Sequence, residues 1–207
     1  MRESLANLIE RMALSEPGVD SSASVSWHAH REAETVTDLS ALPELCVYLD
    51  SNPRPHLRAA AYFLIGKIGK NTGNTDCAAA LAARAALEID KYALSGLLNR
   101  LADLSKPIQI DLSPVFALLR DPRWLVRHSA IASLKNSVSP ESELRILELL
   151  SGSTDSHDVA YCQATLNSIG TAISLPALRS RLSSRSRDVR MSAQLAIEAI
   201  EMRTQHH

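Results

Sequence analysis

The chain has 207 residues, 45% of them hydrophobic and 22% charged, which is typical of a folded globular chain rather than a disordered one. Its formal net charge of −1 argues against general nucleic-acid binding, because proteins that neutralise many phosphates carry a basic excess. No window approaches about 18 uncharged apolar residues, so no membrane span is predicted. Residues 1–14 lack the apolar stretch of a signal peptide, and we therefore expect a cytoplasmic location.

Aromatic residues make up only 4% of the chain, which predicts an aliphatic, alanine-rich core of packed helices. Cys46, Cys77 and Cys162 are far apart, odd in number and form no CxxC pair. We expect them to be buried free thiols in a reducing compartment.

Residues 1–39 are predicted to form an N-terminal cap. A helix over about residues 3–14 would cover the apolar face of the first repeat, and residues 15–39 read as a polar, partly disordered loop. His28 and His30 would share one face of a strand, and such a pair can bind zinc. Since no third ligand has suitable spacing, a plain polar loop is favoured and no metal site is predicted.

An internal repeat occupies residues 40–203. Three segments share a template in which an apolar residue precedes an arginine and an alanine follows three positions later; the arginines are Arg58, Arg127 and Arg190. Successive arginines are two repeat periods apart, and weaker copies of the template, at Lys91 and Ala160, lie one period after Arg58 and Arg127. A period in the thirties indicates about five helical hairpins.

The segment Leu118–Ala130 resembles the HEAT-repeat family, with a Leu-rich first helix, an Asp121-Pro122 turn, the Val126-Arg127 pair and Ala130. Segments 42–69 and 175–203 match with the Asp-Pro altered, whereas 75–104 and 140–169 match only in period and helical pattern. The fold class that this implies is all-α: an α-solenoid of about five HEAT-like helical hairpins with an N-terminal capping helix. Residues 204–207 are expected to fray.

The resemblance also implies a structural ladder of ion pairs between repeats. Asp121 and Arg127 would belong to it, and Arg58 and Arg190 are interpreted as structural because the period that places them also places the core.

A partner-binding role is predicted around Trp124. It stands in a turn beside Arg123, a composition typical of binding hot spots, although it could instead fill a gap over the neighbouring hairpin. The second helices are expected to line a concave surface. The other candidate contact residues on them are His128, Lys135, Tyr161, Arg187, Met191 and Gln194.

Charged residues fall in alternating bands. A basic run covers 179–190, an acidic band covers 141–158, and Arg120, Arg123 and Arg127 precede it. Mutual neutralisation is the first interpretation; the second is a surface for an acidic protein partner or a phosphate backbone.

No GxGxxG, Walker A, HExxH or GxSxG motif is present, so no catalytic residue and no cofactor are predicted.

The resemblance implies a protein–protein interaction scaffold, an adaptor or a regulatory module, such as a bacterial immunity-type protein, that binds another protein. Two alternatives stay open. Some HEAT-like proteins resemble DNA glycosylases that hold alkylated duplex DNA, for which Trp124, Asp121 and the arginine run are a thin match. Bilin-lyase-like proteins also resemble HEAT repeats.

Overall fold

The structure is a computed structural model, which describes residues 1–205. Its chain divides into two compact units, one spanning Met1–Ser105 and the other starting at Lys106. In the described residues the regular elements are helices, with one isolated β-bridge between Lys106 and Ser137. The predicted all-α class is therefore confirmed.

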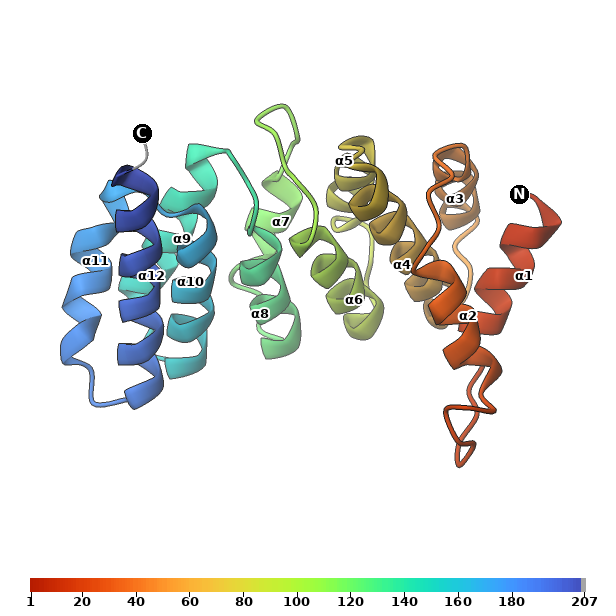
Figure 1. The fold of residues 1–207 in the computed structure, drawn as a ribbon, viewed down its shortest axis with the longest axis horizontal. Coiled ribbons are helices and arrows are strands. Elements are labelled where there is room, and N and C mark those ends of the chain that lie inside the picture. Colours follow the sequence, from red (N-terminus) through yellow and green to blue (C-terminus); the bar gives the residue numbers. More distant parts are fainter. Residues whose placement is uncertain (206–207) are drawn as a thin grey trace. The chain divides into compact units, whose positions relative to one another are not determined.

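The first unit consists of three pairs of helices. They are α1 (Glu3–Met12), α2 (Val25–Ala33), α3 (Ala41–Asp50), α4 (Pro55–Thr72), α5 (Asp76–Arg84) and α6 (Lys91–Ala102) (Figure 1). The second helices α4 and α6 pack on each other, and α1 and α2 both pack on α4. The predicted capping helix is thus present as α1, slightly shorter than expected.

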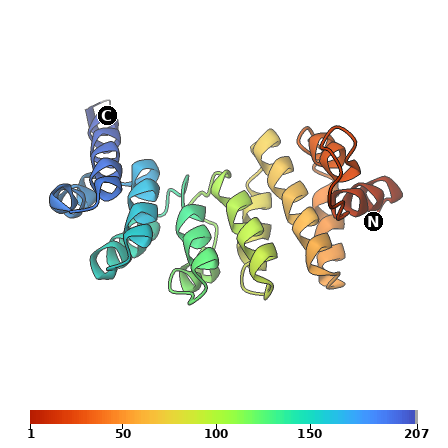
Figure 2. The same cartoon turned by 90° about the horizontal axis from the view of Figure 1, so that it is seen from below.

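The second unit repeats the pattern, with two shorter first helices, α7 and α11. It contains α7 (Ser113–Leu118), α8 (Trp124–Ser133), α9 (Pro140–Gly152), α10 (Ser156–Ile169), the 3₁₀ turn η1 (Ala172–Ser174), α11 (Leu175–Ser180), a second 3₁₀ turn η2 (Arg181–Ser183) and α12 (Arg187–Gln205). Figures 1 and 2 show α8, α10 and α12 side by side, and α10 packs on both of the others. Each first helix packs on the second helix that follows it.

Local chemistry explains where these helices begin. Asp90 accepts hydrogen bonds from the backbone N–H groups of Tyr92 and Ala93, and Asp155 accepts one from His157, so both aspartates cap their helices. Proline occupies the first turn of α4, α7, α9 and α11, where a missing N–H leaves no hydrogen bond unmade. Gly73 ends α4 in the left-handed conformation, at φ +71°.

The core follows the repeat. The apolar residues at helical spacing on the second helices are predicted to form the core. Leu57 is half-buried, and the others are buried; they are Ala61, Leu64, Ile68, Val126, Ala130, Leu134, Val189, Ala193, Ile197 and Ile200. The alanines at the three template positions have no exposed surface, which lets adjacent helices approach closely.

Residues 15–39 differ from the prediction, because they contain helix α2. The carboxylate of Glu16 accepts hydrogen bonds from Ser24 Oγ and from the backbone N–H groups of Val25 and Ser26, so the first turn of α2 is capped from a distance. His28 and His30 therefore lie on a helix and not on a strand. Their rings bond separate backbone carbonyls, those of Ser22 and Ser26.

At the C-terminal end, α12 continues through Gln205, so residues 204 and 205 are helical where fraying was expected. Residues 206–207 lie outside the described residues. The predicted division into 1–39, 40–203 and 204–207 stays a prediction. In the described part of the chain, no helix has both the length and the apolar character that crossing a membrane requires.

Gly66 marks a close approach of α4 to α6, and its replacement tests that packing. A Cβ there would lie 2.6 Å from the Cβ of Arg100, an atom that moves only with its helix. We expect Gly66→Ala to lower the free energy of unfolding by about 1–2 kcal/mol, because overpacking outweighs the gain in helix propensity. Chemical denaturation measures this change.

Gly96 on α6 provides the matched control, because a Cβ built there meets no atom within 4 Å apart from its chain neighbours and the backbone of its own helix. Gly96→Ala should stabilise the protein by up to about 1 kcal/mol. Equal effects of the two substitutions would contradict the proposed close contact.

Candidate functional site

Four aromatic rings gather on the N-terminal halves of α8 and α10. Trp124 is the first residue of α8, and its ring centroid lies 5.8 Å from that of His128. His128 stacks on Tyr161 of α10, with centroids 4.4 Å apart and ring planes 16° apart, and His157 lies 6.3 Å away. Trp124 and His157 are one repeat period apart, as are His128 and Tyr161, so the repeat brings these side chains together.

The cluster has an exposed edge and a buried base. Trp124 is 64% exposed and Tyr161 41%, whereas His128 is only 8% exposed. A hydrogen bond of 2.8 Å joins His128 Nε2 to Asp158 Oδ1, and Arg127 Nε lies 2.9 Å from the same oxygen. Asp158 therefore fixes the imidazole on which Tyr161 stacks. His128, predicted as a contact residue, instead supports the residues that face solvent.

The ring-bearing positions on α8 and α10 form a row, and helix α12 supplies the equivalent positions of the next repeat. Arg187 and Met191 follow His157 and Tyr161 by about one repeat period, and both are exposed. Gln194, one turn further, is exposed and donates a hydrogen bond of 2.7 Å to Glu198. The row thus changes from aromatic on α8 and α10 to cationic and aliphatic on α12.

Lys135 lies apart from this row. It follows the C-terminal end of α8, about 16 Å along the helix axis from Trp124 at about 1.5 Å per residue. Arg123, in contrast, lies next to Trp124 in the chain. It donates two hydrogen bonds to Asp121, from Nε to Oδ1 at 2.9 Å and from Nη2 to Oδ2 at 2.8 Å. These hydrogen bonds from Arg123 hold the pKa of Asp121 below its ordinary value.

The template arginines differ in their partners. Arg58 forms two hydrogen bonds of 2.6 Å with Glu88, and Arg127 binds Asp158; both acids belong to the hairpin that follows the arginine. The carboxylate that pairs with Arg127 is thus Asp158 and not Asp121, whose backbone carbonyl accepts from Arg127 Nη1 instead. Within the described residues, the acceptors found for Arg190 are backbone carbonyls, those of Ser184 and Arg185.

Sequence reasoning missed His157 and Glu88, and it placed Asp158 in the acidic band without identifying it as the partner of Arg127 and His128. Counting one repeat period from Trp124 would have found His157. The two acids lie slightly less than one period after template arginines, but this spacing identifies them only once one hairpin is known to reach the next.

One group in the described part of the chain has the composition of a metal site. Ligand atoms of His128, Asp155 and Asp158 lie within 4.8 Å of one another. The guanidinium of Arg127 already lies 2.9 Å from Asp158 and 3.7 Å from Asp155. Because a cation already neutralises these carboxylates, we assign the group to ion pairing and do not assign a metal to it.

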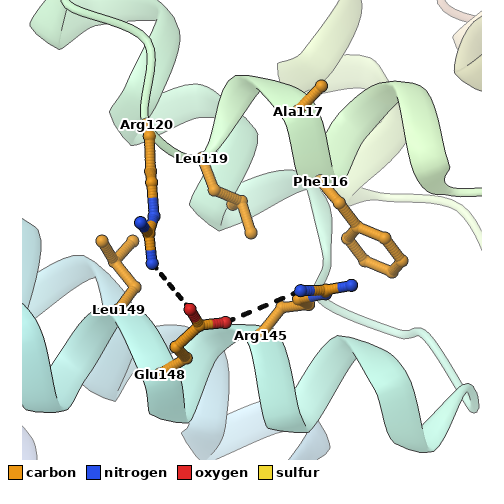
Figure 3. A pocket seen from close by; sticks show the side chains of 7 residues that line it. All are labelled: Phe116, Ala117, Leu119, Arg120, Arg145, Glu148 and Leu149. Carbon is orange, nitrogen blue, oxygen red and sulfur yellow. Dashed lines mark hydrogen bonds and ion pairs between the residues drawn. The ribbon is translucent and has the colours of Figure 1, made fainter.

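Most carboxylates of the acidic band pair with neighbouring arginines, whereas Glu143 accepts hydrogen bonds from Thr171 and Ser174. Figure 3 shows Glu148 between Arg120 and Arg145. The ion-pair distances are 2.7 Å to Arg120 and 3.6 Å to Arg145, and these residues line a cavity of about 360 Å³ between the α7 segment and α9. Arg145 also pairs with Glu141. The predicted mutual neutralisation thus holds for Arg120 and Arg127, whereas the 179–190 run supplies no ion pair to this band in the described residues.

Comparisons with known proteins address the fold. The family model of HEAT repeats matches residues 112–198. A designed armadillo repeat protein is 17% identical with a TM-score of 0.56, and the match covers 95% of this chain and 99% of the designed one. An engineered protein is 19% identical with a TM-score of 0.58, and that match covers 97% of this chain and 98% of the engineered one. No curated protein sequence matches the chain.

These matches extend the all-α assignment to a repeat architecture. The family match lies in the second unit, where Leu118–Ala130 carries the most complete template, and the matches to solved structures extend over nearly the whole chain. Helical-repeat folds of this kind commonly serve as scaffolds that bind other proteins. The predicted α-solenoid class is confirmed, and the chain is similar to HEAT-repeat proteins over residues 112–198.

Proposed function

We propose that the chain is a protein-binding scaffold or adaptor, and that the face formed by α8, α10 and α12 contacts its partner. The observation that carries the proposal is the ring cluster: Trp124 is 64% exposed at the start of a helix while the imidazole next to it is buried and hydrogen-bonded. An exposed tryptophan on a fixed base is the composition of a binding hot spot.

The fixed base matters energetically. Ordering a flexible side chain costs about 0.5–1.5 kcal/mol when an interface forms. Here the stack on His128 already limits the motion of Tyr161, and His128 is itself held by Asp158. Less free energy is therefore lost when a partner packs on Tyr161. Met191 adds a flexible apolar contact further along the face, of the kind that adapts to different partners.

A catalytic role of the DNA-glycosylase type has less support. It would need a carboxylate able to act, and Asp121 is the acid in the segment that gave the resemblance. Both of its oxygens are held by Arg123, so this observation favours the binding role.

Replacing Trp124 and Tyr161 by alanine tests the proposal. We expect the doubly substituted protein to capture its partner at least about tenfold less well, because hot-spot truncations cost about 2 kcal/mol or more. The melting temperature should stay close to that of the wild type, since both side chains are largely outside the core. Quantitative capture from nuclease-treated native cell extract, read by mass spectrometry, measures the change.

Val47→Ala on α3 is the control, since Val47 is 68% exposed and lies outside the ring cluster. It should leave capture unchanged. A large fall in melting temperature on removing Trp124 and Tyr161 would contradict the proposal, because it would assign the rings to the core.

A further inference from the structure

Most arginines of the second unit fall into two groups. Arg120, Arg123, Arg127, Arg145 and Arg179 each pair with a carboxylate within 4 Å. Around the turn from α11 to α12, no carboxylate partner is found in the described residues for four others: Arg181, Arg185, Arg187 and Arg190. We call these four the arginine turn.

The arginine turn carries an uncompensated positive charge. It spans residues 181–190 and contains one acid, Asp188, so its formal charge is +3. The N-terminus of α12, a helix of 19 residues, adds partial positive charge at the same place. Clustered like charges repel one another, and this repulsion is relieved when a ligand supplies negative charge.

Two of the four arginines are held in place by backbone carbonyls. Arg181 donates to the carbonyl of Leu150 on α9, and Arg190 Nη1 donates to those of Ser184 and Arg185. Neutral carbonyls orient a guanidinium without cancelling its charge. Arg185 and Arg187 extend the same positive surface, and Arg187 is exposed.

The arginine turn adjoins the surface that exposes Trp124 and Tyr161, which we call the aromatic face. Arg187 and Met191 occupy on α12 the repeat positions of Trp124 and His128 on α8. Helix α10 lies between these two helices and packs on both α8 and α12. Packed helices lie about 8–10 Å apart, so α8 and α12 are separated by about 20 Å. At about 3.3 Å per residue, an extended segment of about six residues spans that distance.

We infer that the partner presents a short acidic segment, with an aromatic or aliphatic anchor on Trp124 and Tyr161 and its carboxylates on the arginine turn. This inference rests on the proposed function. A protein segment fits better than a duplex, because the arginines at the Trp124 end of the face, Arg123 and Arg127, are already paired with Asp121, Asp155 and Asp158. A continuous phosphate backbone would meet uncompensated positive charge at one end of the face only, and a peptide can place its acids at that end.

The test uses two labelled peptides and one duplex. The first peptide has two tryptophans followed by a run of glutamates, the second has glutamines in place of the glutamates, and the third probe is duplex DNA. Binding to the full chain is followed by fluorescence anisotropy. We expect the glutamate peptide to bind most tightly. The double substitution Arg185→Glu with Arg187→Glu should lower the affinity for the glutamate peptide about tenfold or more, and the loss should be larger at low salt.

Arg54→Glu with Lys91→Glu is the matched control. It reverses the same number of charges at the N-terminal ends of α4 and α6, in the other compact unit. It should leave the affinity nearly unchanged, so an equal loss in both variants would show a general charge effect and overturn the inference.

The remaining outcomes separate the two proposals. Equal affinity for the two peptides, no binding of either, or preference for the duplex would overturn the acidic-segment inference. If the glutamates made no difference but Trp124→Ala still weakened peptide binding, the aromatic face would be supported as a binding surface and the acidic-segment inference would be overturned. If arginine reversal abolished binding and Trp124→Ala did not, the acidic partner would be supported and the aromatic face contradicted.

Discussion

Replacing Glu88 by glutamine is expected to lower the free energy of unfolding by about 3–5 kcal/mol, because it leaves the charge of Arg58 buried without a counterion. The Glu88 side chain has no exposed surface and that of Arg58 is 10% exposed. The carboxylate accepts two hydrogen bonds from Arg58, one from Tyr62 Oη at 2.9 Å and one from the backbone of Asp90 at 2.9 Å. Urea denaturation of the substituted and wild-type chains measures the loss.

Two control variants separate this ion pair from general effects. Arg31→Gln removes an exposed pair with Glu34 and should leave stability nearly unchanged. Replacing Arg58 and Glu88 together by leucine should recover most of the loss, because removing both charges leaves none unpaired. A double variant no more stable than Glu88→Gln would contradict the account.

The same pair predicts a dependence on pH. Burial alone would raise the pKa of Glu88, but hydrogen bonds from Arg58, Asp90 and Tyr62 outweigh burial and hold the pKa below its ordinary value of 4.5. The carboxylate therefore stabilises the fold fully above about pH 4.5, and this contribution is lost as the pH falls through the folded-state pKa. The stability difference between wild type and Glu88→Gln should be constant near neutral pH and narrow in acid.

The repeat arginines show what a sequence pattern can and cannot predict. The apolar–Arg–Ala template identified the second helices and their core, because burial of Ala61, Ala130 and Ala193 depends on a periodicity that is written in the chain. The partner of each arginine is a tertiary contact. Glu88 lies just before the weak copy at Lys91, where no template residue marks it.

Helix α2 was missed for a related reason. Its stretch is short and polar, and the residues that satisfy its first N–H groups include Glu16, which lies well before the helix begins. The local signals were Ser24, which accepts from the backbone of Trp27, and the buried pair Ala29 and Ala33 at a spacing of one helical turn. A run of turn-forming residues from 15 to 24 outweighed them.

The candidate site was predicted in part. Trp124 and Arg123 stood out by composition, and the structure places Tyr161, Arg187 and Met191 in register with the row that starts at Trp124. That His128 is a buried support could not be predicted, because its burial depends on Asp158 reaching back from the next hairpin.

Arg127 and Arg190 occupy the same template position, yet their replacement should have unequal effects. Arg127→Leu removes the guanidinium that lies 2.9 Å from Asp158, a carboxylate 9% exposed, and we expect a loss of about 2–3 kcal/mol. Arg190→Leu removes bonds to two backbone carbonyls at an exposed site, and about 1 kcal/mol or less is expected. Chemical denaturation of both variants measures the difference.

A double-mutant cycle of Arg127→Leu with Asp158→Asn then isolates the ion pair. A coupling of about 1.5–3 kcal/mol is expected, since a hydrogen bond between charged groups contributes that much. Because Asp158 also fixes His128, Asp158→Asn should loosen the stack on Tyr161 and weaken partner capture beyond its effect on stability. Equal losses for Arg127→Leu and Arg190→Leu would mean that the template position alone, and not the acid it reaches, determines what the arginine contributes.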